Sequence, residues 1–118
     1  MRSAYLGLLL AAALPLAARG ADAKHGEQLF QACKACHNDQ PDALGPSLKG
    51  VVGRKGGALE DFRYSPAMQR AGFTWSDENL KEYLHAPQGK VKGNRMPFSG
   101  MDNAREVDDL VAYLDTLK

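Results

Sequence analysis

The residues best suited to chemistry in this chain form the run Cys33-Lys34-Ala35-Cys36-His37. It contains both cysteines of the sequence, three positions apart, and a histidine follows the second one directly. A C-x-x-C-H pattern permits two thioether bonds to the vinyl groups of one haem, while the histidine places its imidazole on the iron. The motif therefore predicts one covalent haem c, attached through Cys33 and Cys36, with His37 as a metal ligand.

Other uses of a cysteine pair require other surroundings. Two cysteines in an exported protein ordinarily form a disulfide. A thioredoxin-like redox pair needs a βαβ context, and a zinc site needs a second ligand pair at finger-like spacing. The sequence offers neither pattern. A haem-free thiol oxidoreductase is the alternative that a colourless protein with titratable thiols would support.

A sixth iron ligand decides whether the haem only carries electrons or also binds an external molecule. Met96 lies in the stretch 90–100, whose glycines and proline indicate a loop rather than a helix. A methionine in such a loop is not obviously a core residue, so we choose Met96 as the second metal ligand. Its thioether would suit ferrous iron and raise the reduction potential relative to two imidazoles. An open iron site, in a haem enzyme or in the electron-accepting subunit of an oxidoreductase, is the alternative that carbon monoxide binding would reveal. The side chains considered for this position are Met68, Met96, Met101, His25 and His85.

The first 23 residues have the features of an export signal. Arg2 gives a positive start, and the apolar stretch from Leu6 to Ala18 is shorter than the roughly 20 residues that span a bilayer. Ala21-Asp22-Ala23 then offers small residues to a signal peptidase. We expect a cleaved signal peptide over 1–23, one domain over 24–118 and a periplasmic protein of a bacterium. An uncleaved membrane anchor is the alternative.

The charge balance of the chain argues against a nucleic-acid partner. The 118 residues include 15 Lys+Arg and 14 Asp+Glu, and the loss of Arg2, Arg19 and Asp22 with the signal leaves equal numbers. A basic stripe that would neutralise phosphates is therefore not expected. We instead expect a monomer that meets redox proteins, such as a membrane-bound reductase and oxidase or another oxidoreductase, with room for transient contact with the membrane surface. A modest positive patch near the haem edge is expected from Lys34, Lys90, Lys92 and Arg95.

Apolar spacing and capping residues predict three main helices. The first covers 24–35, the second 76–85 and the third 103–117, the last two starting from the N-cap candidates Ser76 and Asn103. A short helix is expected to begin at Ser65, with Pro66 at its first position. The forty residues after His37 contain many glycines and prolines and no sustained alternation, which indicates loops. We therefore expect an all-α domain whose loops wrap around a large apolar ligand.

The sequence resembles the class I c-type cytochromes, the group of mitochondrial cytochrome c and small bacterial soluble cytochromes c, over Gly26 to Leu117. The resemblance implies the small cytochrome c fold, with three main helices and loops around one covalent haem. It also implies a soluble one-electron carrier that shuttles electrons between exported or membrane-bound redox proteins and is not an enzyme. The chain has Met101-Asp102-Asn103 where mitochondrial members carry docking lysines, so the resemblance does not identify the partners. The matching positions are Gly26 and Phe30, Gly45-Pro46 with Leu48, Arg54, Tyr64, Trp75, Tyr83, Leu84 and Pro87, Met96 with Phe98 and Gly100, and Leu110, Tyr113 and Leu114.

The same resemblance implies roles for individual site residues. The Pro46 carbonyl would accept the proton of the axial histidine, and Tyr83 would donate near the methionine sulfur. Phe98 would belong to the methionine ligand loop and lie close to the haem edge. Arg54, Tyr64 and Trp75 would donate to a buried haem propionate. Without the resemblance, the two aromatic residues could be ordinary packed side chains and the arginine a solvated charge.

Overall fold

The computed structural model describes Gly7 and residues 20–118. Most of the predicted export signal therefore lies outside the described residues. The helices of the described part are α1 (Ala23–Phe30), α2 (Pro66–Gln69), α3 (Asp77–His85), α4 (Pro87–Lys90) and α5 (Ala104–Leu114). Within residues 20–118 the one strand-like pairing is an isolated antiparallel bridge between Lys55 and Thr74. No helix of this part is long and apolar enough to cross a membrane.

The predicted N-caps are confirmed at three helices. The side chains of Ser65, Ser76 and Asn103 each accept a hydrogen bond from the backbone N–H three residues further on, at 3.0, 3.1 and 3.1 Å. Each bond satisfies an N–H that has no partner inside its helix. These local interactions explain why α2, α3 and α5 begin where the sequence predicts.

The other helix boundaries differ from the prediction. Helix α1 begins at Ala23 and ends at Phe30, after which turns lead to Cys36. Helix α5 ends at Leu114 instead of Leu117. Pro87 follows the end of α3 and begins α4, a helix that was not predicted, because a proline at the first helical position lacks only an N–H that would be unpaired anyway.

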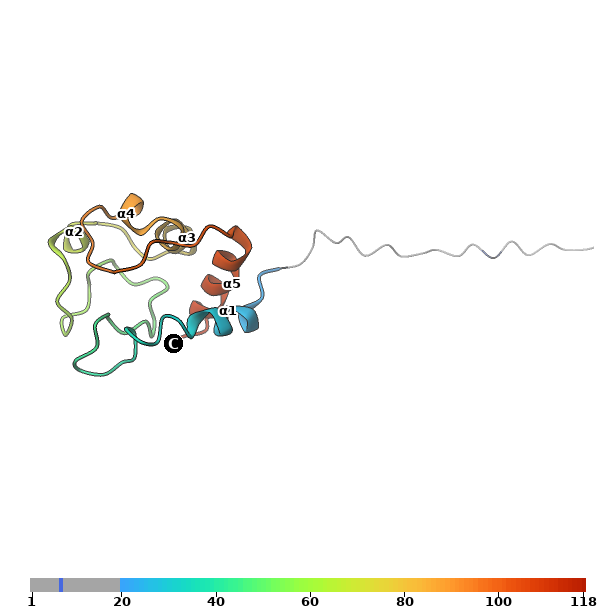
Figure 1. Cartoon of the computed structure of the whole chain (residues 1–118), viewed down its shortest axis with the longest axis horizontal. Coiled ribbons are helices and arrows are strands. Elements are labelled where there is room, and N and C mark those ends of the chain that lie inside the picture. The colour runs from blue at the N-terminus through green and yellow to red at the C-terminus, as the bar shows by residue number, and fades with distance from the viewer. Residues whose placement is uncertain (1–6, 8–19) are drawn as a thin grey trace, which may run out of the picture.

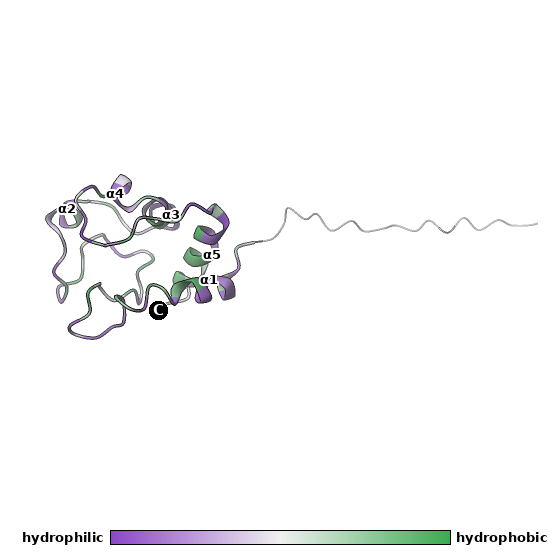
Figure 2. Cartoon of the chain, viewed as in Figure 1, coloured by the Kyte–Doolittle hydropathy of each residue, from purple (hydrophilic) through white to green (hydrophobic). Residues whose placement is uncertain are grey.

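Helices α1 and α5 form a closely packed corner at one end of the domain (Figure 1). Their contact depends on Gly26, because a Cβ atom there would collide with the backbone carbonyl of Asp109. The rings of Phe30 and Tyr113 meet beside it, with their centroids 5.1 Å apart. Figure 2 shows that both helices carry a hydrophobic and a hydrophilic side. The buried core comprises Phe30, Val51, Met68, Trp75, Leu80, Tyr83, Val91, Leu110, Val111 and Leu114.

Long loops make up most of the opposite side of the domain, between α1 and α2 and between α4 and α5 (Figure 1). Backbone hydrogen bonds connect the first of these loops to the segment before α3. The N–H of Gly53 donates to the Trp75 carbonyl, and the Trp75 N–H donates to the Arg54 carbonyl, both at 2.8 Å. These bonds place Trp75 and Arg54 on neighbouring segments.

Candidate functional site

The C-x-x-C-H residues lie on tight turns that follow α1 directly. The Cys33 N–H donates to the Phe30 carbonyl at 2.8 Å, and the Cys33 carbonyl accepts from the N–H groups of Cys36 and His37 at 3.2 and 2.9 Å. Both cysteines are free and partly exposed. Burial raises the pKa of the Cys33 thiol, and the neighbouring Cys36 acts in the same direction. One stretch of tight turns therefore presents two thiols and an imidazole together.

The imidazole of His37 is fixed in one orientation. Its Nδ1 lies 2.7 Å from the carbonyl oxygen of Pro46, as the resemblance implies. Because a carbonyl can only accept, Nδ1 carries the proton, which leaves the Nε2 lone pair free for a metal. A Cβ on Gly45 would lie 2.6 Å from the ring, so glycine is needed for the backbone to pass this close.

The thioether of Met96 is held from α3. The Tyr83 hydroxyl donates to its Sδ atom at 3.8 Å. Burial raises the pKa of Tyr83 to about 12, so this hydroxyl stays protonated and able to donate. The Tyr83 ring also packs edge-on against Trp75, with 5.0 Å between centroids. Trp75, Tyr83 and Met96 therefore follow one another in contact, and we call the surface formed by their side chains the aromatic wall.

Asn94 fixes the start of the Met96 loop, a role that the sequence analysis missed. Its side chain is buried, and its Nδ2 donates to the carbonyls of Pro87 and Val91 at 3.0 and 2.9 Å. Its Oδ1 accepts the Met96 N–H at 2.9 Å. The signal was present, since asparagine commonly bonds to the backbone two residues further on. This bond positions the backbone of the methionine directly.

The end of the Met96 loop is fixed against the end of α3. Gly100 has a φ of +110°, and a Cβ there would collide with the carbonyl oxygen of His85. The His85 Nδ1 lies 2.9 Å from the Met101 carbonyl, and the Met101 N–H donates to the Leu84 carbonyl at 2.9 Å. His85, one of the side chains considered as a sixth iron ligand, therefore bonds to the returning loop.

The three residues expected near a propionate occupy different surroundings. Arg54 donates to the carbonyls of Ser47 and Lys49 at 2.7 and 3.3 Å, and burial lowers its pKa while the guanidinium remains charged. The Tyr64 hydroxyl accepts the Leu59 N–H at 3.2 Å, which leaves its proton available to donate. Trp75 is buried in the aromatic wall. Trp75 thus packs against Tyr83, which contacts Met96. Arg54 and Tyr64 each hydrogen-bond to the backbone of a loop.

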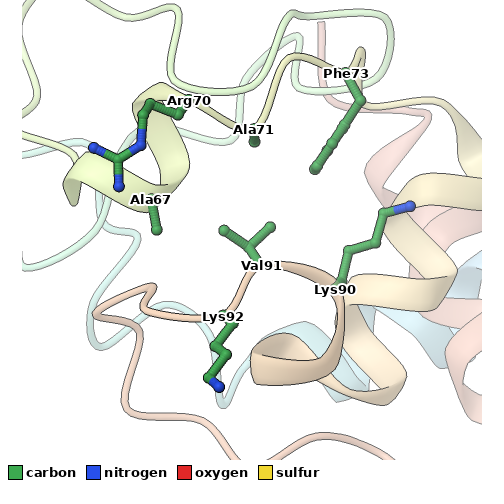
Figure 3. Close-up of a pocket in the computed structure, with 7 residues that line it drawn as sticks. All are labelled: Ala67, Arg70, Ala71, Phe73, Lys90, Val91 and Lys92. Carbon is green, nitrogen blue, oxygen red and sulfur yellow. The ribbon is translucent and has the colours of Figure 1, made fainter.

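The expected positive patch is smaller than predicted. The Lys90 ammonium binds Glu82 and the Asn79 side chain and lies 5.0 Å from the centre of the Phe73 ring. It is therefore neutralised locally. Lys90 and Lys92 both line a cavity of about 350 Å³, and its other lining residues are Ala67, Arg70, Ala71, Phe73 and Val91 (Figure 3). Lys34, Lys92 and Arg95 remain exposed, as does Phe98.

His25 and Asp109 form a pair that the sequence analysis did not predict. Asp109 is buried, and its Oδ2 lies 2.8 Å from Nδ1 of His25, which the sequence analysis considered only as a candidate iron ligand. Asp109 Oδ1 also accepts the Asp22 N–H at 2.7 Å. The pair therefore links α1 to α5.

Comparison with known proteins identifies the family. The family model described as Cytochrome c matches residues 23–118. The chain belongs to the cytochrome c family. It is 40% identical over 117 residues to cytochrome c2 of Blastochloris viridis, covering 97% of this chain and 92% of that protein. It is 44% identical over 100 residues to cytochrome c2 of Rhodoblastus acidophilus, covering 82% and 94%.

A solved structure agrees with the assignment to the cytochrome c family. Cytochrome cH from Methylobacterium extorquens is 45% identical, with a TM-score of 0.77 over 80% of this chain and 98% of that one. The predicted small, all-α cytochrome c fold is thereby confirmed. The chain is a haem c electron carrier and not an enzyme, and it exchanges electrons with redox partner proteins.

The site residues fit the covalent haem c that this cytochrome c family carries. Two adjacent free thiols supply the attachment points, and the imidazole has one nitrogen committed to a carbonyl and the other free. The thioether and the aromatic wall supply a soft donor and an apolar surface. The chemistry of this set of donors matches the group without any change to the chain.

Proposed function

We propose that this chain is an exported one-electron shuttle whose haem iron is held between His37 and Met96. The bound haem supplies the one-electron exchange at its iron. The observation that carries the proposal is the Tyr83 hydroxyl bonded to the Met96 sulfur, in a loop fixed at both ends. These contacts restrict the motion of the Met96 side chain, which supports a stable bond between its sulfur and the iron.

The residues around the ligands favour electron transfer over catalysis. His37 Nδ1 carries a proton and donates it in a hydrogen bond to the Pro46 carbonyl, so the ring offers only Nε2 to the metal. With Met96 as the second ligand, no coordination position is left for a substrate. The thioether and the buried aromatic wall both favour the ferrous state, because a low-dielectric surrounding disfavours added positive charge.

Exposed basic residues support recognition of a partner by charge. Residues 83–101 contain no acidic residue, and Lys92 and Arg95 in this stretch are exposed. Lys34, beside the attachment cysteines, adds a third exposed cation. We infer a small, transient interface with an acidic face of a membrane-bound reductase, oxidase or other oxidoreductase in the periplasm, steered by charge.

The ligand assignment is tested with Met96→Ala and, as the matched control, Met101→Ala. We expect Met96→Ala to abolish the sulfur-to-iron charge-transfer band, lower the reduction potential and allow carbon monoxide to bind the ferrous protein quickly. Met101 bonds to α3 through its backbone, so Met101→Ala should leave the band in place. The reverse pattern would transfer the ligand role to Met101.

A further inference from the structure

Asp22 organises the start of the folded domain, although it lies inside the segment assigned to the signal peptide. Its side chain caps α1 by accepting the N–H groups of Lys24 and His25 at 3.0 and 3.1 Å. Its carbonyl accepts the Gly26 N–H at 2.9 Å, which forms the first turn of the helix. Replacing such a cap ordinarily costs appreciable helix stability.

Asp22 also satisfies a buried carboxylate on the opposite helix. Its backbone N–H donates to Oδ1 of Asp109 at 2.7 Å, and the Asp109 side chain is only 6% exposed. The other carboxylate oxygen accepts from His25. A buried carboxylate that loses a donor is destabilising, because the charge is no longer compensated. Asp22 is therefore part of the folded protein by its contacts.

Cleavage after Ala23 would remove this residue. A chain that began at Lys24 would lack the cap of α1 and one of the two partners of Asp109, at the closest helix contact of the domain. Cleavage after Gly20 would keep all of these interactions, since Asp22 would still be joined through an ordinary amide to Ala21.

The sequence before Ala21 also meets the sequence requirement of signal peptidase. Signal peptidases require small residues at the first and third positions before the cut. Ala18 and Gly20 meet this requirement for a cut after Gly20, whereas a cut after Ala21 would place Arg19 at the third position. We propose, on the basis of the export proposed above, that signal peptidase hydrolyses the Gly20–Ala21 bond. One water is consumed, Gly20 acquires the new carboxylate and Ala21 the new amine.

The test is the N-terminus of the haem-loaded protein, produced from the full chain with its own leader and recovered from the periplasm. Intact mass and N-terminal sequencing should give a start at Ala21, heavier than a Lys24 start by the residues Ala-Asp-Ala. Gly20→Phe places a bulky residue next to the proposed cut and should abolish that start. The matched control is Ala21→Phe, which spoils the cut after Ala23 but should still be processed after Gly20, since Ala21 is exposed and lies after the cut.

The outcomes separate this inference from the proposed function. A wild-type start at Lys24 or Asp22 would overturn the cleavage site and leave export intact. A haem-loaded chain that kept Met1 would overturn both. An Ala21 start that persists in Gly20→Phe would show later trimming, and would overturn cleavage by the signal peptidase at this bond. Where Gly20→Phe shifts the start to Lys24, the shortened protein should melt at a lower temperature than the wild type.

Discussion

The corner made by α1 and α5 and the loops that carry the ligands are stabilised in different ways. The corner is closed by the chain's own side chains, with Gly26 against Asp109 and Phe30 against Tyr113. The loops, residues 38–62 and 91–103, are held by scattered hydrogen bonds and carry Pro46, the partner of His37, and Met96. In a domain of about 95 residues, the corner alone buries too little apolar surface for independent stability. We therefore expect the haem to complete the core on the loop side.

Removing both haem attachment points should have the largest effect on the stability of the ligand loops relative to the α1–α5 corner. In Cys33→Ala with Cys36→Ala, we expect loss of covalent haem and cooperative unfolding of the whole domain, because the loops lose the apolar group they enclose. Haem staining after denaturation and circular dichroism measure the two effects. Lys34→Ala, on the same turn, is the control and should keep both. A double variant with loops still resistant to proteolysis would show that they are stable without the cofactor.

Closing the gap at Gly26 should destabilise the corner and leave the ligand loops unaffected. The added Cβ of Gly26→Ala meets backbone rather than a flexible side chain, so we expect a loss of about 3 kcal/mol in the free energy of unfolding. Denaturant titration of the haem-loaded protein measures it, with the exposed Gln28→Ala on the same helix as control. A change in the charge-transfer band without a change in stability would contradict the separation of the two regions.

Asn94→Ala should affect the ligand loop and spare the corner. It removes the acceptor of the Met96 N–H and the donors to two carbonyls, which predicts a cost of about 2 kcal/mol. When the pH is raised, the sulfur-to-iron charge-transfer band should disappear at a lower pH in Asn94→Ala than in the wild type, because the Met96 loop is held less firmly. Ser99→Ala, exposed in the same loop, should leave the transition unchanged. Equal effects of both variants would mean that Asn94 does not position Met96.

The smallest effect is expected from pH at the corner. The hydrogen bond to Asp109 raises the pKa of His25, burial opposes the rise, and the charges of Asp109, Glu106 and Asp22 add to it. Protonated His25 is thus favoured by folding, and its stabilisation is complete below about pH 6.5 and lost as the pH rises through the raised pKa. The backbone N–H of Asp22, then His25 itself, lowers the pKa of Asp109, so the contribution of the carboxylate disappears in acid as the pH falls through that lowered value.

The measurement is the difference in free energy of unfolding between wild type and His25→Gln. It should be larger below about pH 6.5, the ordinary pKa of histidine, than at a pH above the raised pKa of His25, where the imidazole has lost its proton. Asp109→Asn should remove most of this pH dependence while keeping a side chain of similar size. A difference that is constant over this range would show that the pair acts as a neutral hydrogen bond.

The sequence predicted these two regions unequally, for physical reasons. Helix caps at Ser65, Ser76 and Asn103 are local, since the partner lies three residues away, and all three were correct. The proposed haem attachment site is local in the same sense, because Cys33, Cys36 and His37 lie within five consecutive residues. Contacts between distant segments were missed. His25 meets Asp109 across 84 positions, and no periodicity or spacing reports such a pair.

The family resemblance supplied what spacing could not. Pro46 and Tyr83 were placed near His37 and Met96 only through the resemblance, and the structure gives the two hydrogen bonds. The propionate roles of Arg54, Tyr64 and Trp75 stay predictions. Asn94 was missed by both approaches: its bond to the Met96 N–H two residues on is a common asparagine pattern, but its burial and its bonds to Pro87 and Val91 have no signal in the sequence.

The clamp at Gly100 has a consequence for how this chain can evolve. Gly50 also has a positive φ, +69°, but the space around it is open, so asparagine or aspartate could take its place over generations. At Gly100 the dihedral angle and the His85 carbonyl each exclude a side chain independently. No single exchange at this position is neutral, and a compensating change would have to move the end of α3 first. We therefore expect Gly100 to stay glycine as the sequence diverges, while Gly50, in the loop between α1 and α2, can be replaced.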